Sequence, residues 1–145
     1  MHGKAPTSVM ATTLQIKPEI YPKVDDDATI VLSYSKADAI LQPSWNWPFD
    51  RKDMEVYGRT GSVRTILKDK IELRRQGETQ AHVETLPPLQ APFDDSLHYF
   101  AAVISGEVKD QGSLSALDTN IVVSEILDAA RRSAQSGKAV TLPLK

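Results

Sequence analysis

Ser115–Ser136 reads SALDTNIVVSEILDAARRSAQS and is followed by Gly137. No other stretch of the chain keeps a helical pattern for so long. Its apolar and small residues recur with the 3.6-residue period of a helix, and its charged residues fill the opposite side. The apolar and small residues form two adjacent rows along the helix. One row is Val122, Ile126, Ala129 and Ser133, and the other is Val123, Leu127, Ala130 and Ala134. The stretch therefore predicts one long amphipathic helix.

Both ends of this helix carry recognisable signals. Ser115 is a suitable N-cap, and Asp118 adds a negative charge in the first turn, where the helix dipole favours it. Gly137 can adopt the left-handed conformation that ends a helix. Ala129 and Ala130 are small, so another element can approach closely. We expect that element to be a sheet, because most of the preceding chain has strand character.

Outward from the helix, short alternating or β-branched segments separated by turn residues predict strands. They are Ser8–Ile16, Ala28–Ser35, Ala39–Trp47, Asp53–Tyr57, Ser62–Leu67, Ile71–Arg75, Thr79–Leu86 and Ala139–Leu142. The first hairpin turns at Lys36-Ala37-Asp38, and Pro43 indicates an edge or bulge position. The predicted fold class is α+β: a mainly antiparallel open sheet with two helices packed on one face.

The second helix begins at Asp94 or Asp95 and runs to about Ser105. Its predicted buried stripe consists of Leu97, Phe100, Ala101 and Ile104, and His98 falls on the polar side. A polar loop, Glu107–Leu114, connects it to the long helix.

Three aromatic residues are candidates for an interface. Trp45 and Trp47 are two residues apart, so in a strand both project from the same face. They could cover the hydrophobic core, seal an interface between subunits or stack on a sugar. Tyr57 ends a further strand. Two helices can cover one face of a sheet, so we expect the open face to bind a second copy of the chain.

The bulk composition excludes several classes of protein. The 145 residues predict a single domain spanning 1–145, and the net charge of -2 gives no reason to expect nucleic acid or a membrane surface as a partner. No segment has the length and hydrophobicity of a membrane-spanning helix, and the N-terminus lacks the features of a secretory signal. The chain has no cysteine, so it can form no disulfide. We expect a cytoplasmic location.

No residue is assigned a catalytic, cofactor-binding or metal-binding role from its pattern. The seven glycines form neither a dinucleotide-binding loop nor a phosphate-binding loop, and the three histidines show no zinc-ligand spacing. The run Asp25-Asp26-Asp27 could hold a metal ion or form an acidic turn before a strand. We favour the turn, because no further ligand follows at a metal-loop spacing.

Several short motifs occur in an order that resembles one family. They are Gly3–Val9 (G-x-P-x-S-V in the family), Val24–Ile30, Ser44–Pro48 (S-W-x-x-P), Glu55–Gly58 with Gly61-Ser62, and the closing stretch from Asp118 to Val140. The family is the Gfo/Idh/MocA oxidoreductases, and the resemblance covers nearly the whole chain. It implies NAD or NADP as the cofactor of the full enzyme, a sugar-like or cyclitol substrate, and dimers or tetramers built on the sheet's open face.

The resemblance is to the C-terminal domain of that family. Its members also carry a Rossmann domain with a glycine-rich loop and a catalytic lysine, and further catalytic residues just before the G-x-P-x-S-V motif. None of these has a counterpart among the 145 residues. We therefore expect a domain truncated on its N-terminal side, which supplies a substrate wall and oligomer contacts but is not catalytic alone. The alternative is a free-standing binding or assembly module that reuses the fold.

Overall fold

The structure is a computed structural model that describes residues 5–110 and 113–144. The beginning of the Gly3–Val9 motif and the middle of the Glu107–Leu114 loop lie outside the described residues. The chain divides into two compact units. Unit 1 comprises Met1–Pro48 and Asp110–Lys145, and unit 2 comprises Phe49–Lys109. Each is described by itself.

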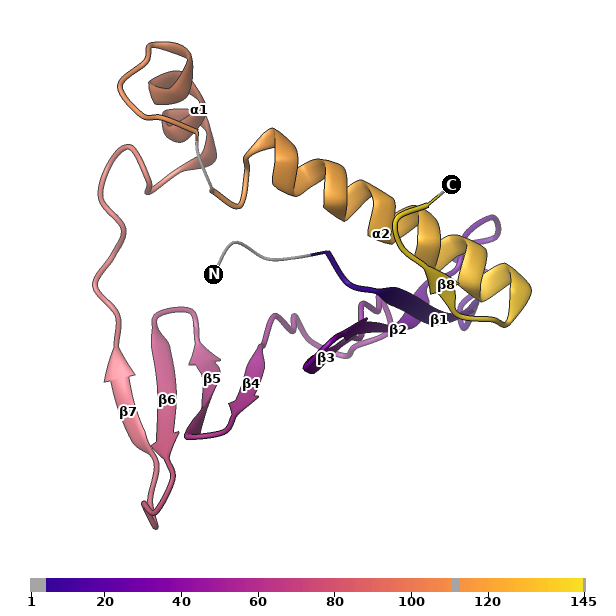
Figure 1. Cartoon of the computed structure of the whole chain (residues 1–145), viewed down its shortest axis with the longest axis horizontal. Coiled ribbons are helices and arrows are strands. Elements are labelled where there is room, and N and C mark those ends of the chain that lie inside the picture. The colour runs from indigo at the N-terminus through magenta and orange to yellow at the C-terminus, as the bar shows by residue number, and fades with distance from the viewer. Residues whose placement is uncertain (1–4, 111–112, 145) are drawn as a thin grey trace. The chain divides into compact units, whose positions relative to one another are not determined.

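Unit 1 contains a four-stranded antiparallel sheet and the long helix. Its strands are β1 (Ser8–Leu14), β2 (Asp27–Tyr34), β3 (Ala37–Leu41) and β8 (Val140–Thr141), in the order β3-β2-β1-β8. We call this sheet A. Helix α2 (Leu117–Ser136) packs on it against β1 and β8 (Figure 1). The predicted partnership between this helix and a sheet is confirmed.

The core of unit 1 lies between α2 and sheet A. Its buried members are Val9 and Ala11 of β1, Leu32 of β2, Ala129 and Ala130 of α2, and Leu142. Val9 and Ala129 have no exposed surface, so the helix and the central strand are in direct contact. The small side chains of α2 thus allow the close approach that the sequence predicts.

The C-terminal end of α2 is as predicted, but the N-terminal end is not. Gly137 is left-handed, with φ of 66°, and its N–H donates to the carbonyl of Ser133. The helix begins at Leu117, and the flanking residue is Ala116, so the prediction of Ser115 as N-cap is wrong. The physical reason is a turn before the helix, in which the hydroxyl of Ser113 accepts the N–H of Ser115 at 3.1 Å.

Unit 2 contains the predicted meander and the shorter helix. Its strands β4 (Glu55–Gly58), β5 (Gly61–Leu67), β6 (Lys70–Arg75) and β7 (His82–Thr85) pair in sequence order to form an antiparallel sheet, which we call sheet B. Helix α1 (Ser96–Ile104) follows, with Asp95 as its N-cap. The carboxylate of Asp95 accepts the N–H of Leu97 at 2.7 Å and that of His98 at 3.3 Å.

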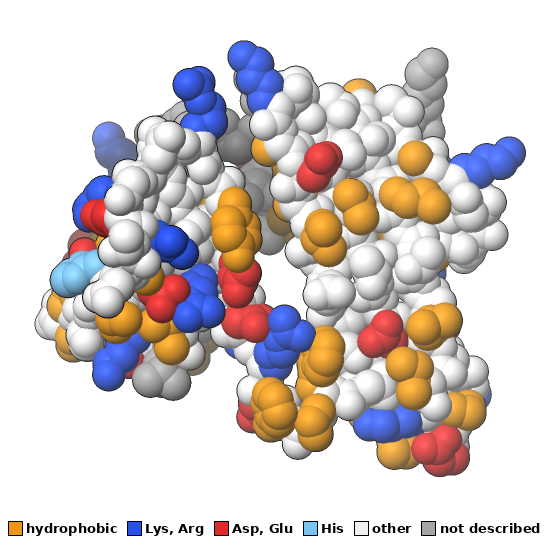
Figure 2. Space-filling view, turned by 90° about the horizontal axis from the view of Figure 1, so that it is seen from below, with side chains coloured by type: hydrophobic (Ala, Val, Ile, Leu, Met, Phe, Trp, Pro, Cys, Tyr) orange, Lys and Arg blue, Asp and Glu red, His pale blue; other side chains and the backbone are white. Residues whose placement is uncertain are grey.

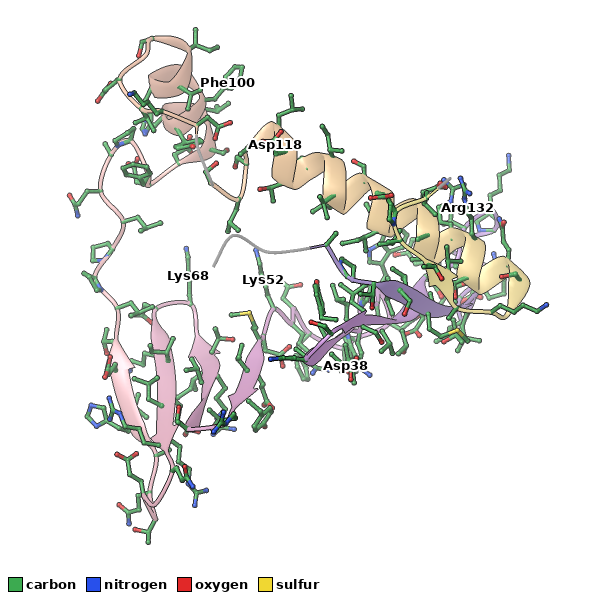
Figure 3. All side chains as sticks on the ribbon, viewed as in Figure 1. Asp38, Lys52, Lys68, Phe100, Asp118 and Arg132 are labelled. Carbon is green, nitrogen blue, oxygen red and sulfur yellow. The ribbon has the colours of Figure 1, made fainter. Side chains whose placement is uncertain are left out.

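The predicted buried stripe of α1 is wrong. Leu97, Phe100 and Ile104 are between 62% and 74% exposed, and Ala101 is exposed as well. Phe100 is labelled on this helix in Figure 3. The buried residue is Ala102, because the chain folds back after the helix and the N–H of Val108 donates to the carbonyl of Ala102 at 3.1 Å.

The α+β class and the antiparallel pairing are confirmed. The strands divide between two sheets, and within the described residues α2 is the helix that packs on one of them. The division falls between Pro48 and Phe49, beyond the end of β3. The chain still contacts the start of β2 after Pro43, because Ser44 forms an isolated bridge with Asp27. In the part of the chain that the structure describes, neither helix is long and apolar enough to cross a membrane.

Candidate functional site

Within unit 1, α2 covers one face of sheet A, and no helix of the described residues of this unit packs on the other face, which we call the open face of sheet A. Side chains alternate along a strand, so Val9 and Ala11 face α2 while Met10 lies on the open face. Met10 pairs with Val31 and Val31 with Ile40, which gives an apolar row across three strands. Ile40 is 68% exposed.

The figures agree with this assignment. Figure 3 labels Asp38 of β3 on the side of sheet A that faces away from α2, as its pairing with Ser33 requires. Figure 2 views the molecule from below and shows hydrophobic side chains at the surface of unit 1 on this side.

Trp45 and Trp47 lie beyond the end of β3. The strand ends at Leu41, so the prediction of a strand reaching Trp47 is wrong, and the alternation argument does not apply to the two tryptophans. Trp45 is 59% exposed and Trp47 is 41% exposed, and neither belongs to the buried core of unit 1. Of the three roles that the sequence left open, covering this core is the one that the structure does not support.

Trp45 is held at the end of sheet A by short contacts. The backbone N–H of Trp45 donates to the backbone carbonyl of Asp26 at 2.9 Å. Its ring lies against that of Tyr21, with the ring centroids 4.8 Å apart and the planes tilted by 50°. Tyr21 was not singled out by the sequence, because the contact joins two loops that are far apart along the chain.

Asp26 organises this end of the sheet. It is only 3% exposed, and its carboxylate accepts the N–H groups of Ile16 at 2.7 Å and Lys17 at 2.8 Å. Burial by itself raises the pKa of Asp26. The hydrogen bonds from Ile16, Lys17 and Asn46 outweigh burial, and the net result is a pKa below the ordinary value. The middle carboxylate of the Asp25-Asp26-Asp27 run thus closes a turn, and the described residues contain no group of three potential metal ligands.

Tyr57 lies in unit 2, on a charged face of sheet B. The Tyr57 hydroxyl donates to Glu55 at 2.6 Å, and this hydrogen bond, with the charge of Glu55, raises the pKa of Tyr57. Arg64 and Glu72 pair at 2.6 Å in the same register row as Glu55. The next row, Val56, Val63 and Leu73, lies on the other face and is apolar. Tyr57 is therefore on the same face as Glu55, Arg64 and Glu72, and it is 77% exposed.

One further pair of ionisable groups was missed from the sequence. Nδ1 of His98 lies 3.1 Å from a carboxylate oxygen of Asp94, and this hydrogen bond raises the pKa of His98. His98 lines an open hollow of about 420 Å³ along α1, with Ala91, Pro92, Ala101, Ala102, Ser105 and Glu107. The separation of four residues between Asp94 and His98 was the available signal, although Asp94 lies just before the N-cap Asp95 and reaches His98 in the first turn of α1.

Solved structures share this fold across almost the whole chain. An oxidoreductase from Agrobacterium radiobacter, in complex with NAD+, L-tartaric acid and magnesium, matches 94% of the chain with a TM-score of 0.72 and 18% identity. An aldose-aldose oxidoreductase from Caulobacter crescentus, complexed with glycerol, matches 97% with a TM-score of 0.74 and 17% identity. A protein from Sinorhizobium meliloti described as a myo-inositol dehydrogenase matches 97% with a TM-score of 0.67 and 18% identity.

The chain spans 43%, 42% and 45% of these three chains, respectively, so it corresponds to less than half of each. A search of curated proteins finds no significant match. These likenesses define the fold class as that of a domain found in oxidoreductases.

The sequence itself defines the family. The family described as "Oxidoreductase family, C-terminal alpha/beta domain" matches residues 2–142. The chain therefore belongs to the Gfo/Idh/MocA oxidoreductases, as their C-terminal domain, and the resemblance seen in the short motifs is confirmed.

Proposed function

We propose that residues 1–145 act as one domain of an NAD(P)-dependent oxidoreductase, on the substrate side, in the cytoplasm. The observation that carries this proposal is the family match over residues 2–142, because it includes all eight strands and both helices of the described residues. In this proposal the domain forms part of the wall around a sugar-like substrate and supplies contacts between subunits. It does not perform hydride transfer alone.

The cofactor and substrate class rest on the structural relatives. One of them is bound to NAD+, one acts on aldoses, and one is described as acting on myo-inositol. The chain itself has no glycine-rich loop at the N-terminus of a helix, the arrangement that holds a dinucleotide pyrophosphate. In the proposal, binding of NAD or NADP is therefore the task of a Rossmann domain, and this chain contributes polar groups near the substrate.

Assembly is the second part of the proposed role. Met10, Val31 and Ile40 form an apolar row on the open face of sheet A, and contact between this row and water is unfavourable. Trp45 and Trp47 lie in the same unit. The same face of a second copy could cover this row in a two-fold arrangement. Tyr57, in unit 2, remains a candidate contact on the charged face of sheet B.

Two experiments test the proposal: a measurement of nucleotide binding and sequencing of the DNA upstream of codon 1. Calorimetry of the 145-residue chain with NAD and with NADP should give no one-site binding at micromolar affinity. Saturable binding in that range would contradict the assignment of the cofactor site to another domain. DNA upstream of codon 1 that encodes a Rossmann segment in frame would support the oxidoreductase reading. A translation start with its own ribosome site would favour a free-standing assembly module.

A further inference from the structure

The hollow along α1 lies between the helix and the segments that precede and follow it. The helical residues in its lining are three or four positions apart, so they occupy one side of α1. The apolar part of the lining consists of small side chains from this side and from the segment before the helix: Ala91, Pro92, Ala101 and Ala102. A hollow of about 420 Å³ with such a lining can accept a short carbon chain.

The polar groups that line the hollow are hydrogen-bond acceptors. Asp94 binds Nδ1 of His98 at 3.1 Å, so Nε2 is the ring nitrogen left for a ligand, and it carries a lone pair when the imidazole is neutral. The hydroxyl of Ser105 donates to the carbonyl of Ala102 at 3.1 Å, which leaves the hydroxyl oxygen as an acceptor. Glu107 adds an exposed carboxylate. A ligand that complements these groups must therefore be a hydrogen-bond donor.

The charge around the hollow is negative when His98 is neutral. Asp94 and Asp95 lie at the start of α1, and Glu107 lies just beyond its end. Among the described residues, no Lys or Arg lines the hollow. The electrostatic potential there favours a donor that carries a positive charge over a neutral donor.

We propose that the hollow along α1 is a binding site for a small organic cation, namely a primary ammonium group on a short carbon chain. The N–H groups of the ammonium donate to the acceptors that line the hollow, and the carbon chain packs on the apolar lining. The inference concerns unit 2 alone and goes beyond the proposed function, because it needs neither a nicotinamide cofactor nor a second copy of the chain.

Protonation of His98 opposes this ligand. The hydrogen bond to Asp94 raises the pKa of His98, so the imidazolium persists to a higher pH than in free histidine. The imidazolium has no lone pair at Nε2 and repels a second cation. The other ionisable groups around His98 are Asp94, Asp95 and Glu107, and carboxylates ordinarily titrate well below this range. Binding is therefore strongest above the pKa of His98, and by reciprocity a bound cation lowers that pKa.

The test is an NMR titration of the 145-residue chain with n-butylammonium chloride, and n-butanol is the neutral probe of the same length. With butylammonium at about pH 8.5 we expect saturable shifts at the amides of α1 and at the imidazole of His98. Binding should be weaker at about pH 5.5, and n-butanol should bind more weakly than butylammonium at the higher pH. Titration of the His98 imidazole should give a lower pKa with butylammonium present than without it.

Glu107→Gln and Glu19→Gln are the matched variants. Each removes one negative charge from an exposed side chain, but Glu19 lies in unit 1. Both variants should stay folded, because substitutions at exposed positions of this kind change stability little. Glu107→Gln should weaken the binding of butylammonium by about twofold to fivefold, the effect of one exposed ion pair, and Glu19→Gln should leave the binding unchanged.

Three results would overturn the inference. The first is a set of shifts that does not saturate or that spreads over both units, because this indicates a general effect of salt. The second is equal affinity for n-butanol and butylammonium, because the site then does not select a cation. The third is equal affinity of Glu107→Gln and Glu19→Gln for butylammonium, because the cation then binds outside this hollow.

Discussion

At the scale of single residues, the acid sensitivity of unit 1 should depend on Asp26. Its pKa is lowered in the folded chain, so folding favours the ionised carboxylate. The resulting stabilisation is fully present above the ordinary pKa of aspartate, about 3.9, and is lost as the pH falls through the lower folded value. Asp26→Asn should be less stable than the wild type at neutral pH. The difference between them should shrink as the pH falls below about 4, as followed by urea unfolding at each pH.

Asp25→Asn is the matched control for this measurement. Asp25 is the preceding residue and is exposed, so its replacement should leave both the neutral stability and the acid profile nearly unchanged. A difference between Asp26→Asn and the wild type that is constant with pH would contradict a role for the charge of Asp26.

The residues that the sequence could identify are those whose role depends on a local repeat. Ala129 and Ala130 were expected on the buried side of the helix because periodicity alone fixes that side. Asp26 could not be distinguished from Asp25 and Asp27, because its partners Ile16, Lys17 and Asn46 come from other loops. The contact of Ser133 with Met10 was equally invisible, since 123 positions separate the two residues.

At the scale of the elements, the register of α2 can be tested by overpacking. Ala130 is 6% exposed and lies in the core, so Ala130→Leu should destabilise the chain by about 1–3 kcal/mol in urea melts. Arg132 is exposed and pairs with Asp128 one turn earlier, at 2.7 Å. Because exposed pairs of this kind contribute little, Arg132→Leu should stay within about 0.5 kcal/mol. The reverse order would mean that a different side of the helix faces the sheet.

A close approach within sheet B gives a second test. A Cβ atom at Gly61 would lie 2.4 Å from the carbonyl oxygen of Arg74 on the neighbouring strand, far inside a normal contact. Gly61→Ala should therefore push β5 from β6 and cost about 1–3 kcal/mol. At Gly58 the nearest atom is 3.5 Å away, so Gly58→Ala should cost less. Amide exchange along β6 measures both effects, and equal loss of protection in the two variants would contradict the argument.

The first and last residues of the strands were predicted closely where turn residues flank the strands, as in the meander of sheet B. The prediction failed where one sequence pattern is compatible with two different structures. Trp45 and Trp47 have the spacing of a strand, but β3 ends at Leu41. The stripe Leu97, Phe100 and Ile104 has the spacing of a buried helix face, but periodicity cannot say whether a partner is present, and in this chain those residues are exposed.

At the scale of the whole molecule, the proposed self-association can be measured by sedimentation over a micromolar range. We expect the wild type to associate and Ile40→Lys to weaken association, because a charge would enter the apolar row on the open face of sheet A. Ile121→Lys is the control, since Ile121 lies on α2 and is 57% exposed. A wild type that stays folded and monomeric throughout would exclude this interface.

The tryptophans are tested in the same way. The paired change Trp45→Ser and Trp47→Ser should leave a folded chain, because both side chains lie outside the core of unit 1. If they belong to the interface, this variant should also associate more weakly. Unfolding of the variant would show instead that the tryptophans support the fold itself.

Where α2 packs on β1, the N–H of Ala11 donates to Oγ of Ser133, 122 positions away, and all of unit 2 is encoded between them. During synthesis, β1, β2 and β3 leave the ribosome long before α2 does. Sheet B pairs only neighbours in sequence, so it can form while the apolar side of sheet A, with Val9 and Leu32, is still bare. Exposed strands of that kind aggregate readily. We therefore expect the nascent chain to need a chaperone until the final helix has been made.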